Sequence, residues 1–209
     1  MSRAADLVAR QQSRLTEACT VRFIRDAADG NLTDEAFRRY LVVEEDFVLT
    51  AVRVLGLVVA ESTSLDNARS HVASLSDLVG EQREYFANLR ARYPYSGDAA
   101  ALLHRSSALS EYALGLAQTD GRPAALVGMF AAESLYLQWC RAAALVPADR
   151  RAALQEWIDL HTRPQFVQQV EALAREVDAM PETVTDSDLD RWFQGMLIAE
   201  IAFHEVVAT

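Results

Sequence analysis

Apolar and polar residues recur at helical spacing from one end of this chain to the other. The longest such segment begins at Thr33 and runs to about Glu61. Charged and apolar residues alternate in its first half, and its second half is the almost wholly apolar run AVRVLGLVVA. A helix that is apolar on all sides is buried between neighbours. The β-branched residues of the run also suit a strand, but so long a segment without a proline favours a helix.

Short groups of turn-forming residues separate the remaining helices. They lie at Asp29-Gly30, at 93–97 (YPYSG), at 119–121 (TDG) and around Pro181. The pattern predicts these further helices: residues 3–18, 21–28, 65–92, 98–118, 122–145, a short one that begins at Pro147 and carries Trp157, 164–177, and a last one to Val207 capped by Asp186 or Ser187. We therefore expect an all-α bundle of about eight helices in a single domain over residues 1–209.

The composition agrees with long helices and removes several classes of function. The 8 glycines and 5 prolines make up about 6% of the chain, against roughly 12% in ordinary proteins. All 20 basic residues are arginine, so mechanisms that need a lysine Schiff base or a P-loop lysine are excluded. The net charge of −10 disfavours binding to nucleic acid or to an anionic membrane surface.

The cysteines and the first residues indicate a protein of a reducing compartment. Cys19 and Cys140 have no CxxC spacing and are too few for a disulfide scaffold. The opening sequence MSRAADLVARQQSRL is charged and lacks the apolar core of a signal peptide. No apolar run approaches the ~20 residues of a membrane span. We expect a cytoplasmic protein without a membrane segment.

Isolated acidic residues in apolar helices are the main candidates for chemistry. Glu133 and Glu200 each lie in an otherwise apolar segment, and a carboxylate buried there is costly unless it is paired or hydrogen-bonded. Tyr40, Glu44 and Phe47 form one stripe of a third helix. Each isolated acid has an aromatic residue three positions later: Tyr136 and Phe203.

Three segments resemble the TenA/thiaminase II family. Residues 23–48, FIRDAADGNLTDEAFRRYLVVEEDFV, are similar to the opening signature of that family, and EWIDLHTRPQF and LIAEIAFHEVVA are similar to two later stretches. The resemblance extends over about residues 5–208. It implies the haem-oxygenase-like helical bundle, a homodimer or homotetramer, and hydrolysis of thiamin or of its aminopyrimidine breakdown products.

The resemblance also assigns residues to roles. The family's pyrimidine-binding aspartate falls on Glu44, and its C-terminal acid/base glutamate falls on Glu200. The catalytic cysteine is missing, and the helix AAESLY resembles the branch in which a glutamate, here Glu133, takes its place. Cys140 lies about two turns further on. A carboxylate is a weaker nucleophile than a thiolate but a good general base for water.

The expected function is therefore hydrolysis of an aminopyrimidine by deamination or amide hydrolysis, with Glu133 and Glu200 as catalytic residues and no cofactor or metal. The expected substrate-binding residues are Glu44, Phe47, Tyr40, Tyr112, Tyr136, Glu81, His161 and Phe203. Three further places differ from the family pattern: its Q-D-Y stretch is Val43-Glu44-Glu45 here, a pocket tyrosine is replaced by His161, and the tryptophan after Phe203 is replaced by His204.

Three alternatives stay open. The chain could be a binding protein that keeps the site but lacks the chemistry. It could be a di-metal oxidase with ligands among Glu81, Glu84, Glu133, Glu200 and His204, although the E-x-x-H pair of di-iron bundles is absent. Transcriptional regulation is the third, and the acidic charge disfavours it. Trp139 and Trp157 are expected in the core or a subunit interface.

Overall fold

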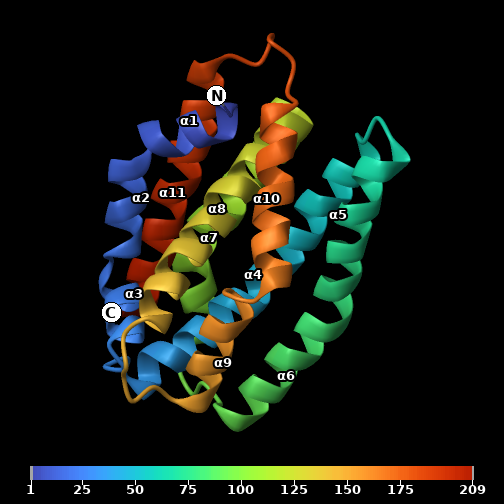
Figure 1. Cartoon of the computed structure of the whole chain (residues 1–209). Coiled ribbons are helices and arrows are strands. Elements are labelled where there is room, and N and C mark those ends of the chain that lie inside the picture. Colours follow the sequence, from blue (N-terminus) through green and yellow to red (C-terminus); the bar gives the residue numbers. More distant parts are fainter. Residues whose placement is uncertain (1, 209) are drawn as a thin grey trace.

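The computed structural model describes residues 2–208, and every regular element in this range is helical (Figure 1). The α-helices are α1 (Arg3–Arg10), α2 (Gln12–Cys19), α3 (Arg22–Ala28), α4 (Asp34–Ala60), α5 (Leu65–Asp77), α6 (Arg83–Arg92), α7 (Ala99–Gly115), α8 (Gly121–Ala144), α9 (Ala152–Leu160), α10 (Pro164–Asp178) and α11 (Asp186–Ala208). Two π-helical segments, η1 (Leu78–Gln82) and η2 (Leu116–Asp120), join α5 to α6 and end α7. The all-α prediction is confirmed.

Three predicted boundaries are wrong in detail. The segment 3–18 is interrupted at Gln11; α1 packs mainly on α10 and buries Leu7, while α2 packs on α11 and α8 and buries Leu15. The helix expected from Pro147 begins at Ala152 instead. Arg150 explains the delay, because its guanidinium donates to the backbone carbonyl oxygens of three residues and holds the preceding chain in a loop: Ala28, Ala143 and Val146.

The last helix is capped one residue earlier than predicted. The Thr185 hydroxyl accepts from the Asp188 backbone N–H at 3.2 Å, and an Asp188 carboxylate oxygen accepts from the Thr185 backbone N–H at 3.1 Å. This reciprocal pair resembles the capping box, with an aspartate in the position that usually holds glutamate. α11 carries Glu200, so the cap fixes the start of a helix that is central to the site.

Four long helices form the centre of the bundle. α11 packs against α7 and α8, and α4 packs against α7 and α8 from another side. α1, α2 and α3 cover one flank of α11, while α5 and α6 lie at the opposite side of the molecule (Figure 1). One core cluster of buried apolar side chains extends from Ala4 to Val207. α4, α8 and α11 therefore turn their inner faces toward one another.

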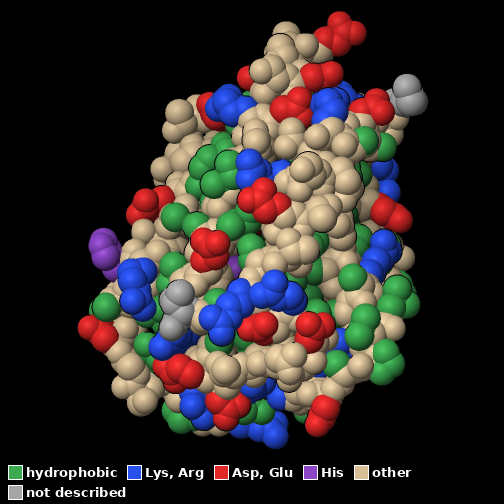
Figure 2. Space-filling model, turned by 90° about the vertical axis from the view of Figure 1, so that its left-hand side faces the viewer, with side chains coloured by type: hydrophobic (Ala, Val, Ile, Leu, Met, Phe, Trp, Pro, Cys, Tyr) green, Lys and Arg blue, Asp and Glu red, His purple; other side chains and the backbone are tan. Residues whose placement is uncertain are grey.

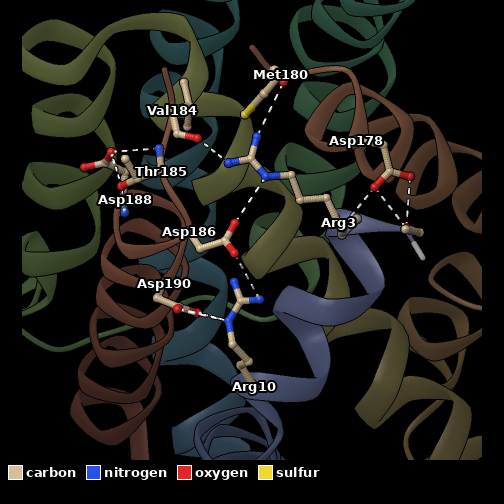
Figure 3. A network of polar contacts seen from close by, with 11 residues as sticks. Arg3, Arg10, Asp178, Met180, Val184, Thr185, Asp186, Asp188 and Asp190 are labelled. Carbon is tan, nitrogen blue, oxygen red and sulfur yellow. Dashed lines mark hydrogen bonds and ion pairs between the residues drawn. The ribbon is translucent and has the colours of Figure 1, made fainter. Parts of the chain in front are cut away.

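Two arginines of α1 connect this helix to the loop before α11 and to the beginning of α11 (Figure 3). Arg3 donates to the carbonyl oxygens of Met180 and Val184 and pairs with Asp186 at 3.3 Å. Arg10 pairs with Asp190 at 3.0 Å. These contacts hold α1 against the loop before α11 and against the first turn of α11.

On the face where α2 and α3 lie, acidic and basic side chains are interspersed (Figure 2). Ion pairs within single helices, such as Arg14–Glu17 and Arg22–Asp26, contribute to this pattern. Within residues 2–208, no helix is both long enough and apolar enough to cross a membrane.

Candidate functional site

Three acidic side chains from three helices interact with one another, and two of them, Glu44 and Glu133, are half-buried. Glu44 lies on α4, Glu133 on α8 and Glu200 on α11, and Glu200 is only 1% exposed. The pKa of Glu200 is raised well above its ordinary value, first by burial and then by the negative charges of Glu44 and Glu133. The two predicted catalytic glutamates and the predicted pyrimidine-binding glutamate are thus close enough to influence one another's pKa.

The three acids differ in how easily they ionise. Burial raises the pKa of Glu133 to about 7. Burial, aided by the charge of Glu133, raises the pKa of Glu44 to about 8. Across the described range, no arginine forms an ion pair with any of the three. Burial therefore favours the protonated form of Glu200, while Glu133 divides between its two forms near pH 7.

Two tyrosine hydroxyls connect α4 with α8 beside these acids. The Tyr40 and Tyr136 oxygens lie 3.4 Å apart, and both residues are buried. Hydrogen bonding of both hydroxyls to the Glu44 carboxylate lowers its pKa in part, against the larger effect of burial. The two tyrosines are predicted site residues, and the structure places both at the acids.

Aromatic rings surround this polar centre. His161 stacks on Tyr136 with ring centroids 5.2 Å apart, and its Nδ1–H donates to the Trp157 carbonyl oxygen at 2.7 Å. Burial lowers the pKa of His161 to about 4, so the ring is neutral. Phe203 lies 6.2 Å from Phe47 and continues the wall on the other side. Trp157, expected as a core or interface residue, is buried within this wall.

Two predicted site residues do not join the acids. Glu81 is exposed on η1. The Tyr112 hydroxyl donates to the carbonyl oxygen of Arg191 at 3.3 Å, and its ring packs against Gly195. Arg191 precedes Glu200 by about 13 Å along α11, at 1.5 Å per residue. The half-buried Tyr112 therefore anchors α7 to the first half of α11.

Sequence reasoning missed one residue that contacts a catalytic candidate. Gln169 on α10 donates from Nε2 to Oε1 of Glu133 at 3.3 Å. A glutamine on a half-exposed helix face carries no signal by itself, because its partner lies 36 positions earlier on another helix. Only the packing of α10 on α8 reveals the contact.

Several buried polar atoms around the site have no hydrogen-bond partner in the protein. They are Glu44 Oε2, Tyr85 Oη, Ser134 Oγ, Trp139 Nε1, Trp157 Nε1, Glu200 Oε2 and His204 Nε2. An unpaired buried polar group costs about 1–3 kcal/mol, and native structures contain few of them. The number of unpaired polar atoms near the three acids indicates a site for a polar ligand.

A separate hollow of about 440 Å³ lies on the outer face of α9, lined by Gln155, Glu156, Asp159 and Arg163 among others. None of the three acids lines it. In the part of the chain that is described, no three His, Cys, Asp or Glu side chains lie close enough together to hold a metal ion.

Comparisons with known proteins place this geometry in context. The model of the TENA/THI-4/PQQC family matches residues 22–206. No curated protein sequence matches the chain significantly. Among solved structures, a TenA homologue from P. horikoshii OT3 superposes with a TM-score of 0.85 at 16% identity, covering 99% of this chain and 98% of that one.

Two further structures carry different descriptions. A TenA family transcription regulator from Silicibacter sp. has a TM-score of 0.82 at 16% identity, with 98% of this chain and 96% of that chain covered. A proposed TenA-like thiaminase from Sulfolobus solfataricus P2 has a TM-score of 0.71 at 17% identity, with coverages of 97% and 94%. At such identities these likenesses establish the fold.

Proposed function

This chain belongs to the TENA/THI-4/PQQC family, and on that premise we propose that it is a hydrolase that acts on an aminopyrimidine derived from thiamin. The reaction is deamination or amide hydrolysis, and it uses carboxyl groups in place of a cysteine nucleophile. The description of one structural relative as a proposed thiaminase supports a thiamin-related substrate.

The observation that carries the proposal is the interacting set of Glu44, Glu133 and Glu200. A hydrolytic site needs a base that activates water and an acid that protonates the leaving group, and their proton affinities must differ. With a pKa of about 7, Glu133 is available as the base. With its pKa raised well above the ordinary value, Glu200 keeps the proton that the leaving group requires.

The steps follow from these assignments. Glu133 takes a proton from water, and the oxygen attacks the carbon that bears the amine or the amide nitrogen. Glu200 gives its proton to the departing nitrogen, so that ammonia or a free amine leaves. Gln169 holds one oxygen of Glu133 by its hydrogen bond and directs the other oxygen toward the water.

Glu44 binds the ring rather than reacting with it. Its carboxyl group accepts a hydrogen bond from an exocyclic amine and shares a proton with the adjacent ring nitrogen. The Tyr40 and Tyr136 hydroxyls orient Glu44 for this contact, and the aromatic rings around the acids favour a planar heterocycle as the ligand.

The surroundings of Cys140 support the assignment of Glu133, rather than this cysteine, as the reacting group. It is fully buried on α8, and burial raises the pKa of its thiol well above the ordinary value, so that the nucleophilic thiolate is disfavoured. Glu133, two turns earlier on the same helix, lies beside the other acids.

We also propose that the protein forms a homodimer or homotetramer. Leu49 on α4 and Ile198 on α11 keep about half of their surface exposed, at 54% and 49%. Apolar side chains that remain exposed on long helices favour burial against a second copy. Light scattering at micromolar concentration tests this, and a monomer there contradicts it.

The function is tested with a panel of aminopyrimidines, including N-formylated ones, assayed for release of ammonia or formate. Glu133→Gln lowers turnover by about 10²-fold or more while the volume of the side chain is kept. Glu205→Gln, on the exposed side of α11, is the matched control and keeps full turnover, as does Cys140→Ser. Loss of activity in Cys140→Ser with retention in Glu133→Gln refutes the mechanism. Binding without turnover across the panel identifies a binding protein instead.

A further inference from the structure

His204 has a fixed tautomer. It lies one turn after Glu200 on α11, and its Nδ1–H donates to the Glu200 backbone carbonyl oxygen at 2.8 Å. Because Nδ1 carries the hydrogen, Nε2 of the neutral ring has a lone pair and is an acceptor. Burial lowers the pKa of His204 to about 4, so the ring stays neutral at physiological pH.

The Nε2 atom is buried and has no partner in the protein. His204 is only 1% exposed. Its ring lies among Phe23, Tyr40 and Tyr136, with centroid distances of 5.4 Å, 6.4 Å and 6.1 Å. The hydroxyls of these two tyrosines engage each other and Glu44. The protein therefore leaves a strong acceptor unpaired inside the ring of aromatic residues that adjoins the three acids.

If the side chain at position 204 served only to fill the core, a histidine would not be needed. Phe23, Phe203 and the tyrosine rings would pack equally well around an apolar ring of similar size. An apolar residue would also avoid the cost of an unpaired acceptor. The polar atom is accounted for if a hydrogen-bond donor reaches it from outside the protein.

We propose that Nε2 of His204 is a ligand-binding acceptor in the acidic site, and that it selects ligands that present an N–H or O–H donor. The inference rests on the proposed function for the identity of the ligand, and it adds a specificity-determining residue to that site. A ligand with an apolar group in place of the donor leaves Nε2 unpaired and binds more weakly.

The first arm of the test needs no ligand. Thermal unfolding of His204→Phe is compared with that of His71→Phe, the matched control. His71 is also buried, but its Nε2 contacts Glu176 Oε1 at 2.6 Å. We expect His204→Phe to raise the unfolding midpoint by about 2–4 °C, because an unpaired acceptor is removed, and His71→Phe to lower it. His204→Leu repeats the substitution with a smaller side chain in case phenylalanine does not fit.

The second arm measures binding by calorimetry with two probes of equal size. One is the aminopyrimidine alcohol that cleavage of thiamin releases, and the other carries a methyl group in place of its amino group. We expect His204→Phe to weaken binding of the amino probe by about tenfold, the worth of one neutral hydrogen bond, and to leave the methyl probe unchanged. His204→Gln, whose amide oxygen is an acceptor, restores the preference for the amino probe.

The outcomes separate the two hypotheses. If the wild-type protein binds neither probe, the proposed function fails, and the stability arm decides the role of His204. A lowered midpoint in both His204→Phe and His204→Leu overturns the inference, because it shows that the ring is already satisfied in the folded protein. If the wild-type protein prefers the amino probe and His204→Phe keeps the full preference, the function stands and the inference fails.

Discussion

Replacing Glu44 with glutamine should change how the stability of the protein depends on pH. The folded protein holds the Glu44 proton more tightly than the unfolded chain does, because its pKa rises from 4.5 to about 8. Stability is therefore greatest below the unfolded pKa and falls as the pH rises to about 8. At about 1.4 kcal/mol for each tenfold change in proton affinity, the loss is about 5 kcal/mol.

The Glu44→Gln variant has no carboxyl group to ionise and escapes this loss. A buried amide that lacks some of its partners costs about 1–3 kcal/mol at every pH. The variant should therefore be slightly less stable than the wild type near pH 5 and more stable by about 2–4 kcal/mol near pH 8. Urea unfolding followed by circular dichroism at both pH values measures the crossing.

Asp46→Asn is the matched control, because Asp46 is an exposed acid on the same helix. It removes the same formal charge without changing the interior, so its pH dependence should follow the wild type. Parallel curves for the wild type and Glu44→Gln would refute the view that burial of Glu44 strains the folded state.

Three further predictions concern other parts of the molecule. Turnover should increase with pH through about 7 as Glu133 ionises, which a pH–rate profile measures; a flat profile there excludes Glu133 as the base. Gly195→Ala should destabilise by about 1–3 kcal/mol in urea unfolding, because the new Cβ would lie 1.9 Å from Tyr112 Oη, and combination with Tyr112→Leu should restore stability. Arg3→Ala should lower the thermal midpoint by about 2–4 °C through loss of its contacts to Val184 and Asp186, and an unchanged midpoint would show that these contacts contribute nothing.

The sequence was most informative where a single residue conflicts with its surroundings. Glu133 and Glu200 stand out because each is charged within an apolar helix, and the structure places both with Glu44. The positions of the helices follow from the helical spacing of the apolar residues. These signals are local, and each can be read within one or two helical turns.

Features that depend on packing between helices could not be predicted in this way. Tyr112 occupies the position that the family resemblance assigns to the site, yet its ring packs against Gly195 and its hydroxyl donates to the Arg191 carbonyl oxygen, in the first half of α11. Gln169 reaches Glu133 only because α10 lies on α8. The interruption at Gln11 likewise depends on which neighbours α1 and α2 meet.

The fastening of α1 to the start of α11 has a consequence for how the protein is made. α1 and α2 leave the ribosome long before α11, although α11 packs against both of them. The sides of α1 and α2 that face α11 therefore stay uncovered until α11 has been synthesised, a period in which exposed apolar faces favour aggregation. The third acid, Glu200, also lies on α11. A nascent or truncated chain that lacks α11 thus has neither its closing contacts nor its complete set of acids.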